Sequence, residues 1–240
     1  MLTIKYNKLF QKTLQKFAEE LRKSQDKSFL DKKYSIFYPV IGKDYLANKN
    51  LLVVGQATFD WQPVWNIKKV SSGSEKIIKE SIDYSETTNE ECPLEWINKH
   101  WSDWGIYRSV FWNLTYKVVE KKYNKTDENW NNIIAWSNLM KIAPIYSNPK
   151  GEEINAQVDL CAELFKMELD ELQPVNVLII TNLEGWAEPI LRKSTIHFKI
   201  ENGNYIQATA KYKKTNIIVT SRQRAMEHLP FIEEISKALK

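Results

Sequence analysis

Residues 51–56 read Leu-Leu-Val-Val-Gly-Gln, so four consecutive apolar residues are followed directly by a glycine. A short apolar run that ends at a turn signal is typical of a strand buried on both faces of a parallel sheet. The run therefore predicts a central strand. Residues from Gln56 to Asp60 are expected at the carboxyl end of that strand.

Three further apolar runs have the same character and cover residues 133–142, 175–180 and 217–220. Segments with apolar residues at helical spacing separate the runs or flank them. These segments cover 7–24, 104–122, 152–172, 185–192 and the end of the chain from Pro230. Buried strands that alternate with helices predict an α/β fold, a three-layer α/β/α sandwich around a short four-stranded parallel sheet.

A chain of 240 residues is long enough to bury a substantial core within one domain. We expect a helical N-terminal extension over 1–48 and an α/β core over 49–240. The pair Asn202-Gly203 lies between two strand-like segments and predicts a β-hairpin insertion. Residues 66–95 are polar and show no clear period, which leaves either a long loop or a helix with weak signals.

The composition narrows the class of protein. The 34 basic and 30 acidic residues give a formal net charge of +4, which permits nucleic-acid binding without arguing for it. Two cysteines, Cys92 and Cys161, are too few for a disulfide framework or a four-cysteine metal site. No leader pattern opens the chain and its longest apolar runs are strand-sized, so we expect a cytoplasmic protein with reduced thiols and no membrane span. His100 and His197 share no ligand spacing with a cysteine, so no metal is expected.

In open α/β sheets, ligands bind beyond the carboxyl ends of the strands. That rule selects four short segments as the candidate site, 56–61, 138–144, 181–185 and 220–224. None of the four contains a histidine. Their charged side chains are Asp60, Lys141, Glu184, Arg222 and Arg224.

Nine tryptophans are an unusual number for this length, and six of them fall between residues 61 and 112. Because Trp is a large apolar side chain with one polar atom, most are expected in the core or in the wall of a cleft. The alternative is a platform on which bases stack.

Several motifs follow one another in a recognisable order. They are Val-Gly-Gln-Ala-Thr-Phe at 54–59, Ser-Asn-Leu-Met-Lys-Ile-Ala-Pro at 137–144, a helix with Cys161, Gln-Pro-Val-Asn-Val-Leu-Ile-Ile at 173–180, and Ile-Val-Thr-Ser at 218–221. In this order and spacing the chain resembles the uracil-DNA glycosylase superfamily over about residues 50–240. The resemblance is strongest in 137–181, and it is to the iron-sulfur branch of that superfamily.

The resemblance implies a protein that flips a damaged base out of DNA and breaks its glycosidic bond. Gly55 and Gln56 match the start of the family's first motif, and Phe59 matches an aromatic residue near the base. Asn138 matches the amide that reads a pyrimidine edge. An amide suits that task because it offers a donor and an acceptor together.

The chain departs from the family pattern at the catalytic positions. Ala57 stands where a carboxylate or Asn commonly positions the attacking water, and Asp60 is the nearest replacement. The family's last motif carries a histidine before a proline, whereas this chain has Ser221-Arg222-Gln223. Arg222 can stabilise an anionic leaving base with a different geometry, so Asp60 and Arg222 are the expected catalytic pair. The four cluster-binding cysteines are missing, so neither an iron-sulfur cluster nor another cofactor is expected.

Lys141 and Arg224 are candidates for contact with DNA phosphates. Ion pairing with nearby carboxylates is the alternative for Arg224, and snorkelling from the sheet edge is the alternative for Lys141. The leading hypothesis is a divergent glycosylase-like protein that binds DNA and recognises a flipped base. The alternatives are a catalytically inactive module of the same fold that binds a nucleotide, nucleic acid or protein, and an unrelated function on a shared fold.

Overall fold

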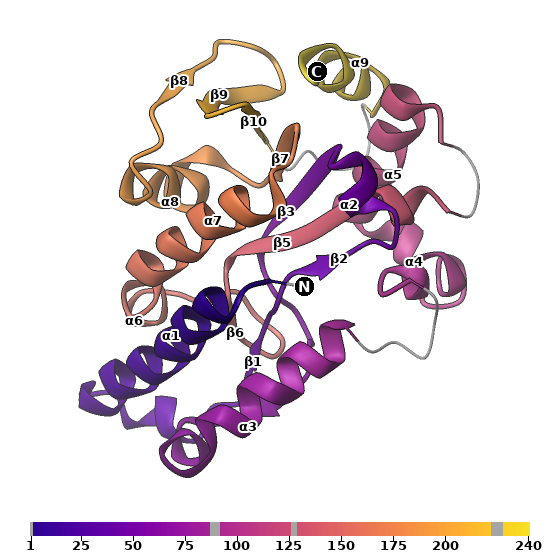
Figure 1. The fold of residues 1–240 in the computed structure, drawn as a ribbon. Helices are drawn as coiled ribbons and strands as arrows, with labels where there is room; N and C mark the ends of the chain where they lie inside the picture. Colours follow the sequence, from indigo (N-terminus) through magenta and orange to yellow (C-terminus); the bar gives the residue numbers. More distant parts are fainter. Residues whose placement is uncertain (1, 87–91, 126–128, 222–227) are drawn as a thin grey trace.

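The computed structural model describes residues 2–86, 92–125, 129–221 and 228–240 (Figure 1). A mixed seven-stranded sheet forms its centre, in the order β2-β5-β3-β7-β10-β9-β8. In that order the strands are β2 (Val40–Ile41), β5 (Ile134–Met140), β3 (Leu51–Ala57), β7 (Asn176–Ile180), β10 (Thr215–Thr220), β9 (Ile206–Tyr212) and β8 (Phe198–Ile200).

Four neighbouring strands of this sheet are parallel. β3 pairs in parallel with both β5 and β7, and β7 pairs in parallel with β10. These are the four apolar runs from which the parallel sheet was predicted. The sheet is larger than predicted, because β2, β9 and β8 extend it on its two sides with antiparallel pairing.

Helices cover both faces of the sheet, as expected for an α/β fold (Figure 1). Leu52 and Val54 of β3 belong to one buried cluster, while Leu51 and Val53 belong to another. The first cluster includes side chains from α1 (Ile4–Lys23), α3 (Ile67–Glu86), α7 (Val158–Leu172) and α8 (Glu188–Lys193). The second includes side chains from α4 (Glu95–Lys99), α5 (Val110–Tyr123) and α9 (His228–Ala238). A strand buried on both faces needs apolar residues at every position, which is the pattern of residues 51–54.

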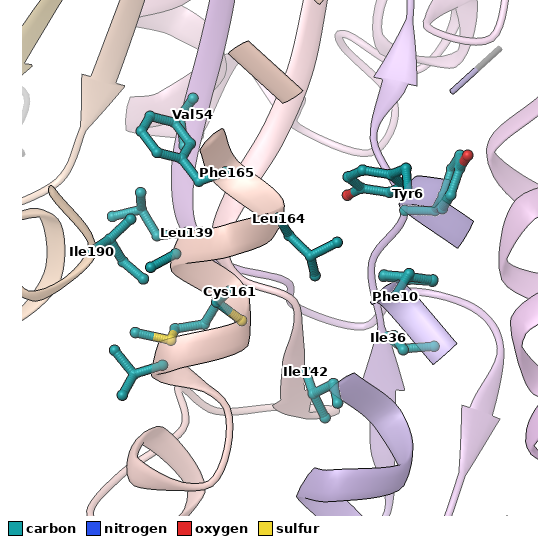
Figure 2. Close-up of a cluster of buried hydrophobic side chains, with 14 of the residues drawn as sticks. Tyr6, Phe10, Ile36, Val54, Leu139, Ile142, Cys161, Leu164, Phe165 and Ile190 are labelled. Atoms are coloured by element: carbon teal, nitrogen blue, oxygen red, sulfur yellow. The ribbon is translucent and has the colours of Figure 1, made fainter. Parts of the chain in front are cut away.

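Figure 2 shows part of the first cluster, where side chains from helices and strands meet. Phe165 of α7 lies beside Val54 of the sheet, and Phe10 of α1 lies near Ile36. The described residues also form the short helices α2 (Tyr45–Asn48) and α6 (Glu152–Asn155) and single turns at Lys27–Leu30, Ile106–Arg108, Trp130–Ile133 and Leu183–Ala187.

The N-terminal segment is more than the helical extension that we predicted. α1 packs against α3 and α7, but the same segment also contributes β1 (Tyr34–Ile36) and the edge strand β2. β1 is the middle strand of a second, three-stranded antiparallel sheet with β4 (Val64–Trp65) and β6 (Ile142–Pro144). Residues 2–48 therefore share the core of the rest of the described chain.

The structure also tests two local predictions. The ambiguous stretch 66–95 contains the helix α3, whose Ile67, Val70, Ile77 and Ile78 are buried at helical spacing. The hairpin around Asn202-Gly203 is confirmed, because β8 and β9 pair antiparallel across it. Among the described residues, no helix is both long and apolar enough to cross a bilayer.

Candidate functional site

A cleft of about 860 Å³ opens where the parallel strands end. It is lined by the last residues of β3, by Asn138 of β5 and by Ile180 at the end of β7. The cleft thus occupies the edge of the sheet that the strand pattern selects. It brings together four of the predicted site residues, Gln56, Phe59, Asp60 and Asn138.

Asn138 and Gly55 form the floor of this cleft. The two residues are register partners on β5 and β3. A Cβ atom built on Gly55 would lie 2.4 Å from the Asn138 Oδ1 atom, so only a residue without a side chain leaves room for the amide. Asn138 is 2% exposed, and among the described residues its Nδ2 atom has no hydrogen-bond partner. A buried donor without a partner costs stability, which makes this amide a candidate ligand-binding group.

Gln56 presents a second amide, which the next strand orients. The Thr181 hydroxyl, fully buried at the end of β7, donates to Gln56 Oε1 over 3.0 Å. Since this bond occupies the carbonyl oxygen, the Nε2 donors of Gln56 remain for the cleft. Gln56 and Asn138 therefore both offer donors to a bound molecule.

Tryptophans form one wall of the cleft, one of the two placements that the sequence analysis predicts for most of them. Trp61, Trp96, Trp112 and Trp136 line it and are each mostly buried. Trp136 sits at the centre of the group, in edge contact with Trp61 at 5.0 Å and with Trp112 at 4.9 Å between ring centroids. Such offset aromatic contacts produce a rigid apolar wall.

The mouth of the cleft carries exposed aromatic side chains. Phe59 is 65% exposed and lies 6.1 Å from the ring of Tyr146, which is 67% exposed. Phe59 is thus at the rim, not beside the floor where the family resemblance implies an aromatic. Trp104, from the connection between α4 and α5, is another exposed lining residue.

Asp60 also lies at the mouth. It has a left-handed backbone with φ of 48°, and its amide nitrogen donates to the Ile145 carbonyl over 2.7 Å. Burial and, second, the Asp60 carboxylate raise the pKa of Tyr84, another lining residue. The Asp60 carboxylate is therefore close enough to Tyr84 to influence another side chain of the cleft lining.

Lys141 does not lie in the cleft. It is fully buried, its Nζ atom pairs with Glu168 Oε1 at 2.7 Å, and it donates to Ser137 Oγ and to the Asn138 carbonyl, both at 2.7 Å. Glu168 also accepts from the Tyr6 hydroxyl at 2.6 Å. This position excludes both the phosphate contact and the snorkelling that we considered for Lys141. Burial of the ammonium is compensated by a carboxylate on α7 that the spacing of the motif did not reveal.

The remaining site predictions fall outside the described residues or lack a functional group. Arg222 and Arg224 lie outside the described residues. Ala57 lines the cleft with a methyl group that cannot hold water. Within the described residues, no three His, Cys, Asp or Glu side chains are grouped so that they could hold a metal ion.

The sequence analysis did not single out several residues of the site. Among the lining residues, Tyr146 and Lys150 belong to loops that no strand-end rule selects. Thr181, which orients Gln56 without lining the cleft, lay in a selected segment. The Trp-rich composition was the only signal for the wall.

A scan against protein-family models finds no family that matches the chain, and a search of curated proteins finds no matching relative.

Proposed function

We propose that this cleft recognises a nucleobase and that the protein is a divergent, glycosylase-like DNA-binding protein. The observation that carries the proposal is the Asn138 amide at the carboxyl edge of the sheet, buried over Gly55 with a donor that no described residue accepts. The motifs around Gln56 and Asn138 that resemble the uracil-DNA glycosylase superfamily support it. An aromatic wall beside two amides suits a planar, polar-edged ligand.

The donors predict which bases fit. Gln56 Nε2 and Asn138 Nδ2 both require acceptors on the ligand, and carbonyl oxygens provide them. Uracil, hypoxanthine and xanthine carry carbonyls where cytosine and adenine carry amino groups. An amino group would face these donors with another donor and leave buried groups unpaired, which is how a polar site rejects a close analogue.

Cleavage in this proposal uses Asp60. A water molecule gives a proton to the Asp60 carboxylate, its oxygen bonds to C1′ of the sugar, and the C1′–N bond breaks with its electron pair moving to the base. The donors of Gln56 and Asn138 stabilise the departing anion. Arg222 remains the proposed cationic partner of this step.

A second candidate is binding of the same ligand without cleavage. Two observations favour it, the methyl group of Ala57 in the first motif and the position of Asp60 at the rim instead of the floor. Product formation separates the two candidates.

The test uses labelled oligonucleotides that carry uracil, hypoxanthine or xanthine, with cytosine and adenine as comparisons. We expect binding of the carbonyl-bearing bases, abasic product from the parent protein, and no product with Asp60→Asn. We expect Asn138→Ala to weaken binding about ten-fold, the loss of one buried hydrogen bond. Asn216→Ala, at the opposite end of the sheet, serves as a control for removal of a strand amide.

Each candidate function predicts a different outcome. Binding without product in the parent supports the second candidate. If Asn138→Ala binds every oligonucleotide as tightly as the parent, base recognition in this cleft is wrong.

A further inference from the structure

We infer that the cleft takes an unpaired stretch of nucleic acid, with the neighbours of the recognised base stacked on the aromatic rim, so that the protein prefers single-stranded over duplex substrates. The inference rests on the proposed function and adds the form of the partner. Three features of the cleft carry it: the exposed rings, the size of the cleft and its charge.

The rim holds two stacking platforms from different loops. Phe59 and Tyr146 form one, with their rings in contact and both side chains about two-thirds exposed. Trp104 forms the other, and the His100 ring covers one of its faces in a parallel stack at 3.4 Å and 3°. The His100 ring is itself fixed, because its Nδ1 atom lies within hydrogen-bond distance of Asp103 Oδ2, at 3.0 Å. Trp104 nevertheless stays 67% exposed.

Exposed rings of this size need a physical reason. Most large aromatic side chains of the described residues are buried, yet three of the most exposed ones gather at the mouth of one cleft. Bases present a π-face whatever their sequence, so they stack on such rings without a need for base-specific contacts. In a duplex the neighbouring bases are already stacked and paired, and these faces are unavailable.

The cleft is also larger than one base requires. Its volume of about 860 Å³ lies toward the upper end of the range for drug-sized ligands, roughly 300–1,000 Å³. A single base on Gln56 and Asn138 leaves the space between the tryptophan wall and the rim for the adjoining nucleotides.

The charge of the described lining residues does not favour the binding of a duplex. Among the described lining residues, Asp60 and Lys150 are the charged ones, so their charges cancel. Duplex binding depends on many Lys and Arg contacts to phosphates and falls steeply with salt. The described lining, with balanced charges and exposed rings, is suited to stacking instead.

The experiment compares the same uracil-containing sequence as a fluorescent single strand and as a duplex, by anisotropy titration at low and high salt. We expect the single strand to bind at least about ten-fold more tightly, since stacking on one aromatic is worth about that factor. We expect Phe59→Ala and Trp104→Ala each to weaken single-strand binding about ten-fold, with little effect on the duplex. Ile200→Ala, which removes an equally exposed apolar side chain from β8, is the matched control and should change nothing.

Each failure has its own meaning. Equal or tighter duplex binding, or rim variants that bind the single strand like the parent, would overturn the inference; if Asn138→Ala still weakens binding in that case, the proposed function stands. If neither form of the oligonucleotide binds, the proposed function itself falls and takes the inference with it.

Discussion

Gly55 and Asn138 are partners on adjacent strands, and the missing side chain of the first makes room for the amide of the second. The sequence marked both residues, one as the end of an apolar run and one through the family resemblance. It did not connect them, because their contact joins β3 and β5 across a parallel ladder.

The contact makes a testable prediction for Gly55→Ala. The new Cβ would lie 2.4 Å from Asn138 Oδ1, so the amide must move out of its position. We expect single-strand binding to fall about ten-fold, as for Asn138→Ala, and the double variant to lose no more than either single one, because both changes remove the same interaction. Anisotropy titration of the uracil-containing strand measures it.

Gly73→Ala is the matched control for this substitution. A Cβ at Gly73 meets nothing within 4 Å, so that variant should bind like the parent. Independent, additive losses for Gly55→Ala and Asn138→Ala would show that the glycine acts on something other than the amide.

At the scale of elements, a buried polar network ties helices to the strand that carries Asn138. Tyr6 of α1, Glu168 of α7 and Ser137 of β5 form hydrogen bonds around the Lys141 ammonium, which also holds the Asn138 carbonyl. All of these side chains are fully buried. Removing one partner of a buried ion pair is costly, yet the intact pair adds little net stability. We therefore infer more from the position of the pair next to Asn138 than from its energy.

Two substitutions separate these effects. Lys141→Met leaves the Glu168 carboxylate without its cation and should lower the free energy of unfolding by about 3–5 kcal/mol. Lys141→Met combined with Glu168→Gln removes both charges and keeps an acceptor for Tyr6, so most of that stability should return. Urea unfolding of the single and double variants measures the difference.

The comparison pair is Lys193 and Asp159, at 2.5 Å with the two side chains 45% and 55% exposed. Lys193→Met should cost much less than Lys141→Met, because solvent screens the carboxylate that remains. If the double variant at 141 and 168 is as unstable as Lys141→Met alone, the ion pair is not the source of the loss.

At the scale of the whole molecule, buried acidic groups make stability depend on alkaline pH. Burial raises the pKa of Cys161 from 9.0 to about 12 and that of Tyr123 from 10.0 to about 12. Below pH 9 both groups are protonated in the folded and unfolded states. Above it the unfolded chain loses protons that the folded chain keeps, so stability falls as pH rises toward 12.

We therefore expect the melting temperature to decline progressively from pH 9 upward, and the decline to be shallower in Cys161→Ala and in Tyr123→Phe. Each variant is compared with its own melting temperature at neutral pH, because both changes also remove buried atoms. A parent protein whose stability is constant or rises over this range would contradict the assignment.

Long helices and strands were predicted from the sequence more completely than short ones. The strands of five to seven residues β3, β5, β7 and β10 were predicted from their apolar runs, and long periodic segments predicted α1 and α7. The edge strand β2 has two residues, too few to show a period, and it exists because β5 pairs with it. The hairpin of β8 and β9 was predicted, but its pairing with β10, which adds both strands to the sheet, was not. The four-stranded expectation therefore fell short of the seven-stranded sheet.

The candidate site divides in the same way. Gln56, Asp60 and Asn138 could be selected because strand ends follow directly from the apolar runs. Lys141 could not be placed, because its partner Glu168 lies on α7 and only the packing of that helix brings the two together. Phe59 was assigned to the base pocket, but the turn after β3 carries it to the rim.

The sequence by itself determined the α/β class, the parallel strands of the sheet and the edge at which the cleft opens, since these depend on local periodicity and on the buried character of each run. Only the tertiary structure decided the sheet's full width, the tryptophan wall, the two oriented amides and the burial of Lys141. Each of these depends on contacts between residues far apart in the chain, and no local pattern records which distant side chain will satisfy a buried charge or cover an exposed ring.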